Sequence, residues 1–481
     1  MHHFNPIFRV FHLLTVLALV NIGAQAQSNQ KPNIIYILAD DLGYGDLSCY
    51  GQQKFSTPNI DKLAKQGIRF TQHYSGSSVC APSRSSLMTG QHTGHTPIRG
   101  NKEAKPEGQV PLPGKAETIA EVLQRAGYAT GAFGKWGLGF IGTEGDPNQQ
   151  GFDEFYGYNC QRQAHRYFPT YLWHNQEKDF LKGNDYTNKV TYAPDMIQEA
   201  TLQFITNHKD KPFFAYVPFV LPHAEIISPN DSVYQKYKGQ FKEDKPFVMP
   251  ESYLSDYGPD IQLEKYASQT EPHAVYATMV SRLDLYVGQI MDKLNELGIA
   301  DNTLVIFTSD NGPAQEGGSD PEFFNGAGGL RGVKRDLYEG GIRCPFIAVW
   351  PNQIKPNTVS DHISAFWDMK PTFADMAGVK KVSTDGLSIL PTLTGKGRQK
   401  KHDHLYWEFP ANGGRKAVRM GQWKGVVYDY DKTGDTKLEL YNLSVDEAEK
   451  NNIASAHPDI VKKVKEIMRN EHQHSTLFPM P

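Results

Sequence analysis

Short apolar runs and longer amphipathic stretches alternate along the first 400 residues of the chain. Four runs rich in β-branched and aromatic residues are expected to form buried strands, at 33–39, 211–219, 303–308 and 345–350. Residues 117–126 and 275–297 show the apolar spacing of helices, and Gly298 is a natural stop for the second helix. Buried strands separated by helices predict an α/β fold, with a large, mostly parallel central sheet flanked by helices.

The hydrophobic pattern changes near residue 401. Short alternating segments follow, which read HLYWEF, KAVRMGQWKGVVYDY and KLELYNL, and a helical pattern then covers 458–470. Alternation of this kind is typical of antiparallel strands with one solvent-facing side. We therefore predict a main domain over 27–400 and a smaller C-terminal antiparallel α+β domain over 401–481. The Gly- and Lys-rich segment 395–401 is the expected boundary.

The first 26 residues have the pattern of a secretory leader. Arg9 precedes an apolar run over 10–20, and Ala24-Gln25-Ala26 supplies the small residues of a cleavage site. A membrane-spanning helix would need about 20 apolar residues, so this run is too short. We expect 1–26 to be a signal peptide and the mature chain to be secreted or periplasmic, without a membrane span. The alternative, a buried core helix, fits a terminal segment with a polar linker less well.

Charge and cysteine content restrict the classes of partner. Lys and Arg total 50 against 53 Asp and Glu, so nothing favours nucleic acid or another polyanion as a general partner. Any anion site must be local. Export would permit disulfides, but the four cysteines lack the spacing of a disulfide framework. If Cys80 has another use, a pairing among Cys49, Cys160 and Cys344 stays open.

Acidic and amide residues follow two of the predicted strands. Asp40 and Asp41 come directly after 33–39, and Asp310 and Asn311 follow the run at 303–308. Ligands of open α/β sheets bind at the carboxyl ends of strands, so these two turns could converge on one site. Their oxygens suit calcium or magnesium better than zinc. Taken alone, either pair could instead cap a turn or a helix.

A cysteine motif and two further segments share a pattern with one enzyme family. Cys80 begins the sequence CAPSR, Thr89-Gly90 follow it, and GYATGAFGKW at 127–136 and GVKRDLYEGGIRCP at 332–345 complete the pattern. These motifs resemble the type I sulfatases, the formylglycine-dependent branch of the alkaline phosphatase superfamily. The resemblance spans nearly all of the mature chain, and the C-x-P-S-R core is highly specific. It implies that 27–400 is a catalytic sulfatase domain.

The resemblance implies a chemical role for Cys80. A formylglycine-generating maturation enzyme would oxidise this residue to an aldehyde before folding is complete. The aldehyde hydrate offers one hydroxyl to attack sulfur and a second to expel sulfate by re-forming the carbonyl, whereas a serine could do only the first. The resemblance also implies one divalent ion, expected to be calcium, which favours the ionised hydroxyl and neutralises sulfate oxygens. Its ligands would be the modified Cys80 and the side chains of Asp40, Asp41, Asp310 and Asn311.

Four cationic or titratable residues are assigned by the same resemblance. Arg84 lies one helical turn beyond Cys80 and would brace the nucleophile and the metal ligands. Lys135 and Lys334 would bind sulfate, because a transferring sulfuryl group needs fixed positive charge around its oxygens. His223 would protonate the leaving oxygen. Each residue alone would more often be a solvated or structural group.

Gly137 departs from the family pattern. Many relatives carry a histidine after Gly-Lys-Trp that is thought to deprotonate the second formylglycine hydroxyl, and glycine cannot act as a base. We hypothesise that His165 reaches into the space beside Gly137, with His92, His95 and His174 as alternatives. If no histidine fills this space, either a metal-bound oxygen or a water molecule acts as the base, or the protein has lost turnover.

The substrate is expected to be a sulfated carbohydrate or a small sulfate ester. The segment 160–173 combines aromatic rings with cationic groups, and we predict His165 and Arg166 from it as substrate-binding residues beside Lys135 and Lys334. Such a segment suits a sugar with acidic groups, although an aromatic loop packed on its own core is equally common. Export favours an extracellular polysaccharide fragment, so we expect an exo-acting carbohydrate sulfatase.

Two other functions compete with this interpretation. A phosphomonoesterase or phosphodiesterase of the same superfamily would share Asp40, Asp310 and the fold, but usually has a Ser or Thr nucleophile and extra histidines for a second metal. A catalytically inactive carbohydrate-binding relative is favoured only by Gly137. Such a protein would not need an oxidisable cysteine.

Overall fold

A mixed β-sheet forms the centre of the computed structural model, which describes residues 31–105, 107–243, 245–250, 254–256 and 262–481. The predicted signal peptide, 1–26, lies outside the described residues. The strand order is β14-β2-β13-β12-β1-β9-β5-β6-β7-β8, with β15 paired to β2. In chain order the strands are β1 (Asn33–Ala39), β2 (Ile68–Tyr74), β5 (Ala129–Lys135), β6 (Glu154–Tyr158), β7 (Tyr171–His174), β8 (Glu177–Phe180), β9 (Phe213–Pro218), β12 (Thr303–Ser309), β13 (Arg343–Val349), β14 (Thr358–Ser360) and β15 (Ser364–Ala365).

The middle of this sheet is parallel, as the sequence predicts. Strands β12, β1, β9, β5 and β6 run side by side in one direction. All four predicted strands are present, with ends shifted by up to two residues. The strand at 345–350 is β13, which runs antiparallel to both β12 and β2. Its apolar run resembles those of its parallel neighbours because it is also buried on both faces.

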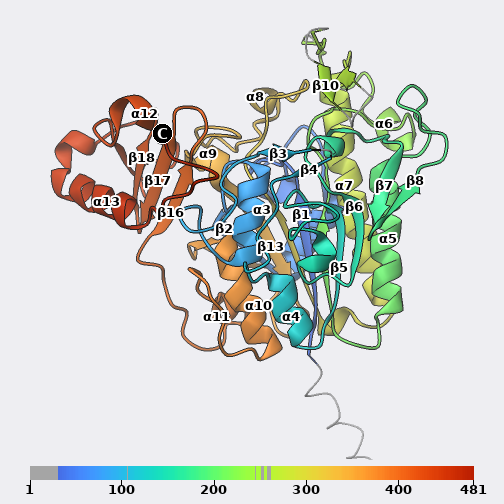
Figure 1. The fold of residues 1–481 in the computed structure, drawn as a ribbon, viewed down its shortest axis with the longest axis horizontal. Helices are drawn as coiled ribbons and strands as arrows, with labels where there is room; N and C mark the ends of the chain where they lie inside the picture. Colours follow the sequence, from blue (N-terminus) through green and yellow to red (C-terminus); the bar gives the residue numbers. More distant parts are fainter. Residues whose placement is uncertain (1–30, 106, 244, 251–253, 257–261) are drawn as a thin grey trace, which may run out of the picture.

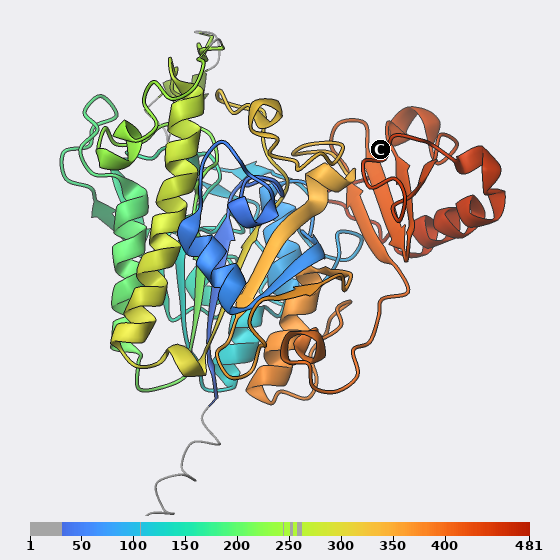
Figure 2. The ribbon, with the colours of Figure 1, turned by 180° about the vertical axis from the view of Figure 1, so that it is seen from behind.

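Two layers of helices cover the sheet. Alternate residues of β1 face opposite layers: Ile35 and Ile37 pack with α5 and α7, whereas Tyr36 and Leu38 pack with α3, α4 and α10. Figure 1 looks onto the α3, α4 and α10 layer, and Figure 2 onto α5 and α7. The helices of the main unit are α2 (Pro58–Gln66), α3 (Cys80–Thr89), α4 (Ile119–Arg125), α5 (Ala193–Asn207), α6 (Ser232–Gln235), α7 (Pro272–Glu296), α8 (Pro321–Phe324), α9 (Glu339–Ile342), α10 (Met369–Ala377) and α11 (Leu390–Thr394).

The C-terminal segment forms a separate antiparallel sheet of β16 (Leu405–Phe409), β17 (Arg415–Met420), β18 (Trp423–Val427) and β19 (Glu439–Asn442). Helices α12 (Tyr430–Thr433) and α13 (Pro458–Asn470) complete this unit, and α13 packs on the sheet through Val464 and Met468. It lies at one side of the molecule in both views (Figures 1 and 2). Trp407 packs against Trp367 and Tyr74 of the main unit, so one apolar cluster joins the two parts.

The described residues include no candidate membrane span and no disulfide. No helix in the described ranges combines the length and apolar character that a bilayer crossing requires. All four cysteines are free, and Cys80, Cys160 and Cys344 are buried. Two short hairpins, β3 (Glu103–Ala104) with β4 (Gly108–Gln109) and β10 (Leu254–Asp256) with β11 (Gln262–Glu264), complete the strands.

Candidate active site

The two acidic turns meet at the carboxyl ends of neighbouring strands. Ala39 of β1 pairs with Ser309 of β12, so the residues that follow each strand lie beside one another. The amide of Asp41 donates to Oδ1 of Asp310 at 3.2 Å. Asp41 itself has a φ of +62°, which turns the chain sharply after the strand. The sheet therefore brings Asp40, Asp41, Asp310 and Asn311 together, as the sequence predicts.

Cys80 enters the same space as the first residue of α3. The preceding residue, Val79, is extended, and the helix beyond it is buried along its whole length. The Cys80 thiol donates to Oδ1 of Asp40 at 3.2 Å. Burial, and then the Asp40 carboxylate, raise the pKa of the thiol well above its ordinary value. An unmodified Cys80 is thus held as a neutral thiol, which is a poor nucleophile.

Arg84 lies one turn further along α3 and bridges the two strand ends. Its guanidinium donates to Oδ2 of Asp310 at 2.8 and 3.1 Å, and it lies 3.4 Å from Oδ2 of Asp40. It also donates to the Lys135 carbonyl. All these groups are fully buried, so the contacts hold the carboxylates in fixed positions. The bracing role of Arg84 in catalysis stays a prediction.

Two buried lysines reach the acidic turns from different strands and loops. Lys135, the last residue of β5, places Nζ 2.6 Å from Oδ2 of Asp40. Lys334 places Nζ 2.7 Å from Oδ2 of Asp41 and 3.5 Å from Glu316. Burial alone would raise the pKa of Asp40, but the surrounding cations, Lys135 first among them, lower it well below its usual range. For Asp310, burial and the nearby Asp40 have the opposite effect and raise the pKa.

His223 lies in the loop after β9, within reach of the second lysine. Its Nε2 accepts from Nζ of Lys334 at 3.1 Å and lies 3.4 Å from Oδ2 of Asp41, while Nδ1 donates to the Ala224 carbonyl. The Tyr167 hydroxyl lies 2.7 Å from the His223 carbonyl oxygen and 2.8 Å from that of Val220. Burial and Lys334 lower the pKa of His223 well below its ordinary value.

The donor set fits a divalent cation that prefers oxygen ligands. Atoms of Asp40, Asp41, Cys80 and His223 that could bind a metal all lie within 4.8 Å of one another. The Asn311 amide nitrogen donates to Asp41 at 2.7 Å, while its buried Oδ1 finds no hydrogen-bond partner among the described residues. An unpartnered buried oxygen beside clustered carboxylates is what a calcium or magnesium ion would satisfy.

Gln161 lies directly beside the Gly137 backbone. A Cβ atom at position 137 would lie 2.2 Å from Nε2 of Gln161, and the glycine has a φ of +74°. The space next to the Gly137 backbone is therefore taken by Gln161, and the role of His165 as a base stays a prediction. His165 stacks on His223, with ring centroids 5.1 Å apart and planes at 11°. Burial, and then the neighbouring His223, lower the pKa of His165 well below its ordinary value.

Two aromatic rings of the segment 160–173 are packed in the core, whereas Tyr171 and Trp173 are partly exposed. Tyr167 and Phe168 are buried against Tyr192, which agrees with the alternative of a loop packed on its own core. The guanidinium of Arg166 pairs with Glu225 at 2.6 Å and is largely buried. This contact ties Arg166 to the loop that follows His223, and its substrate-binding role stays a prediction.

Three residues near the site belong to no motif that the sequence could reveal. Gln161 reaches Gly137, Tyr167 holds the backbone of the His223 loop, and Glu316 approaches Lys334. Each contacts a residue far away in the chain. The departure at Gly137 was a signal that some side chain fills that space, but its identity depends on loop geometry.

Comparisons with known proteins agree with this site. The chain matches the Sulfatase family over residues 32–379 and the family described as N-sulphoglucosamine sulphohydrolase, C-terminal, over 332–474. It is 32% identical to the N-acetylgalactosamine-6-O-sulfatase of Bacteroides thetaiotaomicron, over 92% of this chain and 94% of the relative. It is 31% identical to arylsulfatase A of Homo sapiens, over 93% and 89% of the two chains.

Solved structures of other proteins share the fold of this chain. The crystal structure of Ps i-CgsB in complex with k-i-k-neocarrahexaose is 27% identical and superposes with a TM-score of 0.73, covering 92% of this chain and 94% of that one. The Phosphonate Monoester Hydrolase of Agrobacterium radiobacter shares the fold at 20% identity, with a TM-score of 0.64. From its sequence and its fold together, the chain belongs to the type I sulfatases of the alkaline phosphatase superfamily and is a sulfuric ester hydrolase.

Proposed function

We propose that this sulfatase is exported and removes sulfate from the ends of sulfated carbohydrates, using a formylglycine made from Cys80 and one bound calcium ion. The observation that carries the proposal is the convergence of Cys80 with two acidic turns and two buried lysines. The N-acetylgalactosamine-6-O-sulfatase relative and the Ps i-CgsB complex with an oligosaccharide support a carbohydrate substrate. The leader pattern over 1–26 supports export.

The residues around Cys80 have separate roles in sulfate transfer. Lys135 and Lys334 present fixed positive charge where sulfate oxygens would lie, without reorganisation during the reaction. Nε2 of His223 accepts from Lys334 in this structure, so it must gain a proton before it can pass one to the leaving sugar oxygen. Because burial and Lys334 lower the pKa of His223, its protonated form gives up that proton readily.

Asp40, Asp41, Asp310 and Asn311 would hold the calcium ion beside residue 80. When bound, the ion and the hydrated aldehyde supply positive charge and two geminal hydroxyls. Arg84 keeps the carboxylates of Asp40 and Asp310 in place through its buried contacts. Burial of the whole group excludes bulk water and strengthens these electrostatic interactions.

A sulfate-release assay on protein of known Cys80 state tests this function. The substrates are sulfated mono- and oligosaccharides, an aryl sulfate and matched phosphate esters, with the oxidation of Cys80 measured by mass spectrometry. We expect sulfate release to rise with the formylglycine fraction, to fall on calcium chelation and to return when calcium is added. Cys80→Ser is expected to lose sustained turnover, since serine lacks the second hydroxyl. Turnover by this variant near the parent rate would remove formylglycine from the mechanism.

Two further measurements test the finer parts of the proposal. Oligosaccharides with a single sulfate at the chain end or at an internal sugar separate exo from endo action, and we expect release from the end only. N-terminal sequencing of protein secreted by its host is expected to begin at Gln27. An uncleaved leader, or release from internal sugars at equal rates, would contradict the respective statement.

A further inference from the structure

A second cluster of histidines and carboxylates lies where the C-terminal unit meets the main unit. His92 and His95 come from the loop after α3, and Asp385 from the segment between α10 and α11. His404 directly precedes β16, and Glu471 directly follows α13. These five residues are called the junction cluster below. Four separate parts of the chain therefore supply side chains to one place.

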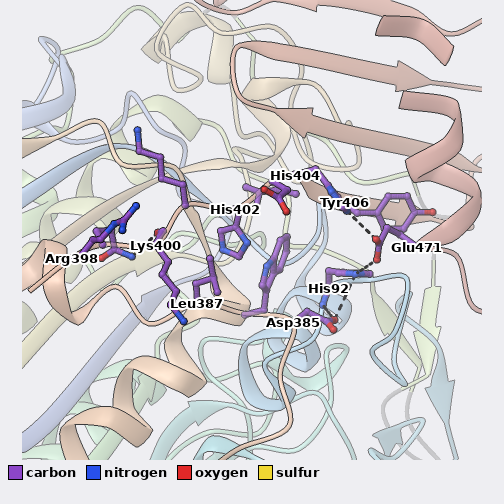
Figure 3. A pocket seen from close by; sticks show the side chains of 14 residues that line it. His92, Asp385, Leu387, Arg398, Lys400, His402, His404, Tyr406 and Glu471 are labelled. Carbon is purple, nitrogen blue, oxygen red and sulfur yellow. Dashed lines mark hydrogen bonds and ion pairs between the residues drawn. The ribbon is translucent and has the colours of Figure 1, made fainter. Parts of the chain in front are cut away.

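The contacts within the junction cluster are short and converge on two carboxylates. Nε2 of His92 lies 3.1 Å from Oε2 of Glu471 and 3.6 Å from Oδ2 of Asp385. Nδ1 of His95 lies 2.9 Å from the same Asp385 oxygen, and its Nε2 lies 3.9 Å from Oε2 of Glu471. Nε2 of His404 lies 3.0 Å from the other Glu471 oxygen. Figure 3 shows Glu471 between His92 and His404, with Asp385 next to His92.

These distances, from 2.9 to 3.9 Å, bracket the spacing of ligand atoms around a zinc-class ion. Zinc bonds of about 2.0–2.2 Å to nitrogen and oxygen place tetrahedral ligand atoms about 3.3–3.6 Å apart. The ligand atoms of His92, His95 and Asp385 all lie within 4.8 Å of one another. Imidazole with carboxylate suits zinc, whereas calcium prefers oxygen alone. The donor chemistry therefore differs from that of the oxygen-rich site beside Cys80.

The junction cluster is separate from the candidate active site but open to solvent. It lies beyond the C-terminal end of α3, whose ten residues extend about 15 Å from Cys80. His92 is 7% exposed, and the other four side chains are 18–26% exposed. All of them except His95 line a pocket of about 940 Å³, through which an ion could enter. Arg398 and Lys400 lie on the far side of this pocket from His92 (Figure 3).

We propose that the junction cluster is a binding site for one zinc-class ion, which clips the C-terminal unit to the main unit. Asp385, His92 and His95 would hold the ion from the main unit, and Glu471 would be the fourth ligand, from the C-terminal unit, with His404 orienting the Glu471 carboxylate through its hydrogen bond. The backbone already packs tightly here, because a Cβ atom at Gly94 would lie 2.1 Å from the Glu471 carbonyl oxygen. Ligands on both sides make the ion a link between the two sheets.

The hydrogen bond from the Gly94 amide to His92 favours an alternative arrangement without a metal ion. Nδ1 of His92 accepts the Gly94 amide at 3.1 Å, so its ring proton lies on Nε2 and is donated to Glu471. Metal binding at Nε2 requires this proton to leave and a proton to be held on Nδ1, and the Gly94 amide must then turn away. A cluster that only shares protons between histidines and carboxylates would keep the Gly94 contact and bind no metal.

The test uses full-length protein without a histidine tag, saturated with calcium so that the oxygen-rich site is filled. Zinc content per chain and the visible absorption of added Co²⁺ report binding, since tetrahedral Co²⁺ has a diagnostic spectrum. We expect one zinc ion per chain, a tetrahedral Co²⁺ spectrum and a higher melting temperature with zinc. His95→Gln and Glu471→Gln are expected to weaken binding at least about tenfold and to abolish the zinc-dependent rise in melting temperature.

Controls separate this site from adventitious binding and from the active site. His474→Gln changes an exposed histidine of the same C-terminal region and is expected to bind like the parent. Asp41→Asn alters the oxygen-rich site and is expected to keep the Co²⁺ spectrum, which separates failure here from failure of the proposed sulfatase mechanism. Circular dichroism without metal verifies that each variant is folded. Absence of a tetrahedral spectrum in the parent, or an unchanged spectrum in folded His95→Gln, overturns the proposal.

Discussion

Because residue 137 is a glycine, the side chain of Gln161 can lie against its backbone. Gln161 fills the space that a larger residue would need, and its buried Nε2 has no hydrogen-bond partner among the described residues. The side-chain oxygen and nitrogen of the nearby buried Asn159 also have no hydrogen-bond partner among the described residues. An unpartnered buried polar group costs about 1–3 kcal/mol. Two such amides, next to the loop that follows Lys135, are therefore expected to find a partner in the substrate.

We predict that Gln161→Ala lowers kcat/KM for sulfate-ester hydrolysis about tenfold, because a hydrogen bond to a charged group contributes about 1.5–3 kcal/mol. Gln161→Glu is expected to lose more, since a carboxylate repels the sulfate. Steady-state kinetics on formylglycine-containing protein measure both effects, with melting temperatures to verify folding. Unchanged kcat/KM in Gln161→Ala would give the amide a packing role only.

Two substitutions of His165 separate a positioning role from a proton-transfer role. Because its ring stacks on His223, we expect His165→Ala to reduce turnover at least about tenfold. His165→Phe keeps an aromatic ring on His223 but cannot carry a proton. Recovery of turnover in His165→Phe would identify His165 as a positioning residue, whereas equal loss in both variants, with sulfated enzyme visible by mass, would support a proton-transfer role.

Among the elements, α4 positions Lys135 indirectly. The helix leads through a turn into β5, whose last residue is Lys135. Thr118 starts the helix with a capping box: its hydroxyl accepts the Glu121 amide at 3.1 Å, and the Glu121 carboxylate accepts the Thr118 amide at 2.7 Å. The hydroxyl also donates to the Gln150 carbonyl at 2.7 Å. One side chain thus satisfies backbone groups in two segments.

Thr118→Ala is predicted to destabilise the protein by about 1–2 kcal/mol, the usual cost of losing a threonine cap together with a buried hydrogen bond. Denaturant unfolding in saturating calcium measures the change in the free energy of unfolding. Thr187→Ala, at an exposed loop threonine, is the matched control and is expected to change it by less than about 0.5 kcal/mol. Equal effects of the two substitutions would contradict the capping argument.

Sequence patterns predicted elements best where one periodicity dominates. The strand at 33–39 and the helix at 458–470 have the predicted ends, because strong apolar patterns and clear breakers bound them. Strand β5 was not predicted, since ATGAFGK is mostly small residues that carry little strand preference. The direction of β13 could not be read from its sequence, because a strand buried on both faces looks the same in either orientation.

For the whole molecule, the active site was more predictable than the surfaces around it. Asp40 and Asp310 follow adjacent strands, so topology alone brings them together, and the cysteine motif adds Cys80 and Arg84. Gln161 and the junction cluster depend on contacts between distant loops, whose geometry no local periodicity encodes. The same limit applies to the boundary near 395–401, where a buried ion pair joins the C-terminal unit to the main unit.

That ion pair predicts how stability depends on pH. Nε2 of His402 lies 2.7 Å from Oδ1 of the fully buried Asp368, which also accepts the Leu387 amide. Burial acts to lower the pKa of His402, but the Asp368 carboxylate outweighs it, and the pKa is raised above the ordinary value. The folded protein therefore binds this proton more tightly than the unfolded chain does. The resulting stability is full below about pH 6.5 and is lost as the pH rises through the folded pKa.

His402→Gln removes the titration but keeps an amide donor towards Asp368. We predict that the parent exceeds this variant in free energy of unfolding by about 1 kcal/mol near pH 5.5, and that the gap narrows towards pH 8.5. Urea unfolding at several pH values, in saturating calcium, measures the gap. His474→Gln, at an exposed histidine, is expected to follow the parent at every pH. A gap that is constant or widens with rising pH would mean that the His402 proton does not stabilise the junction. A group whose pKa is raised in the folded protein contributes less to the free energy of unfolding as the pH rises.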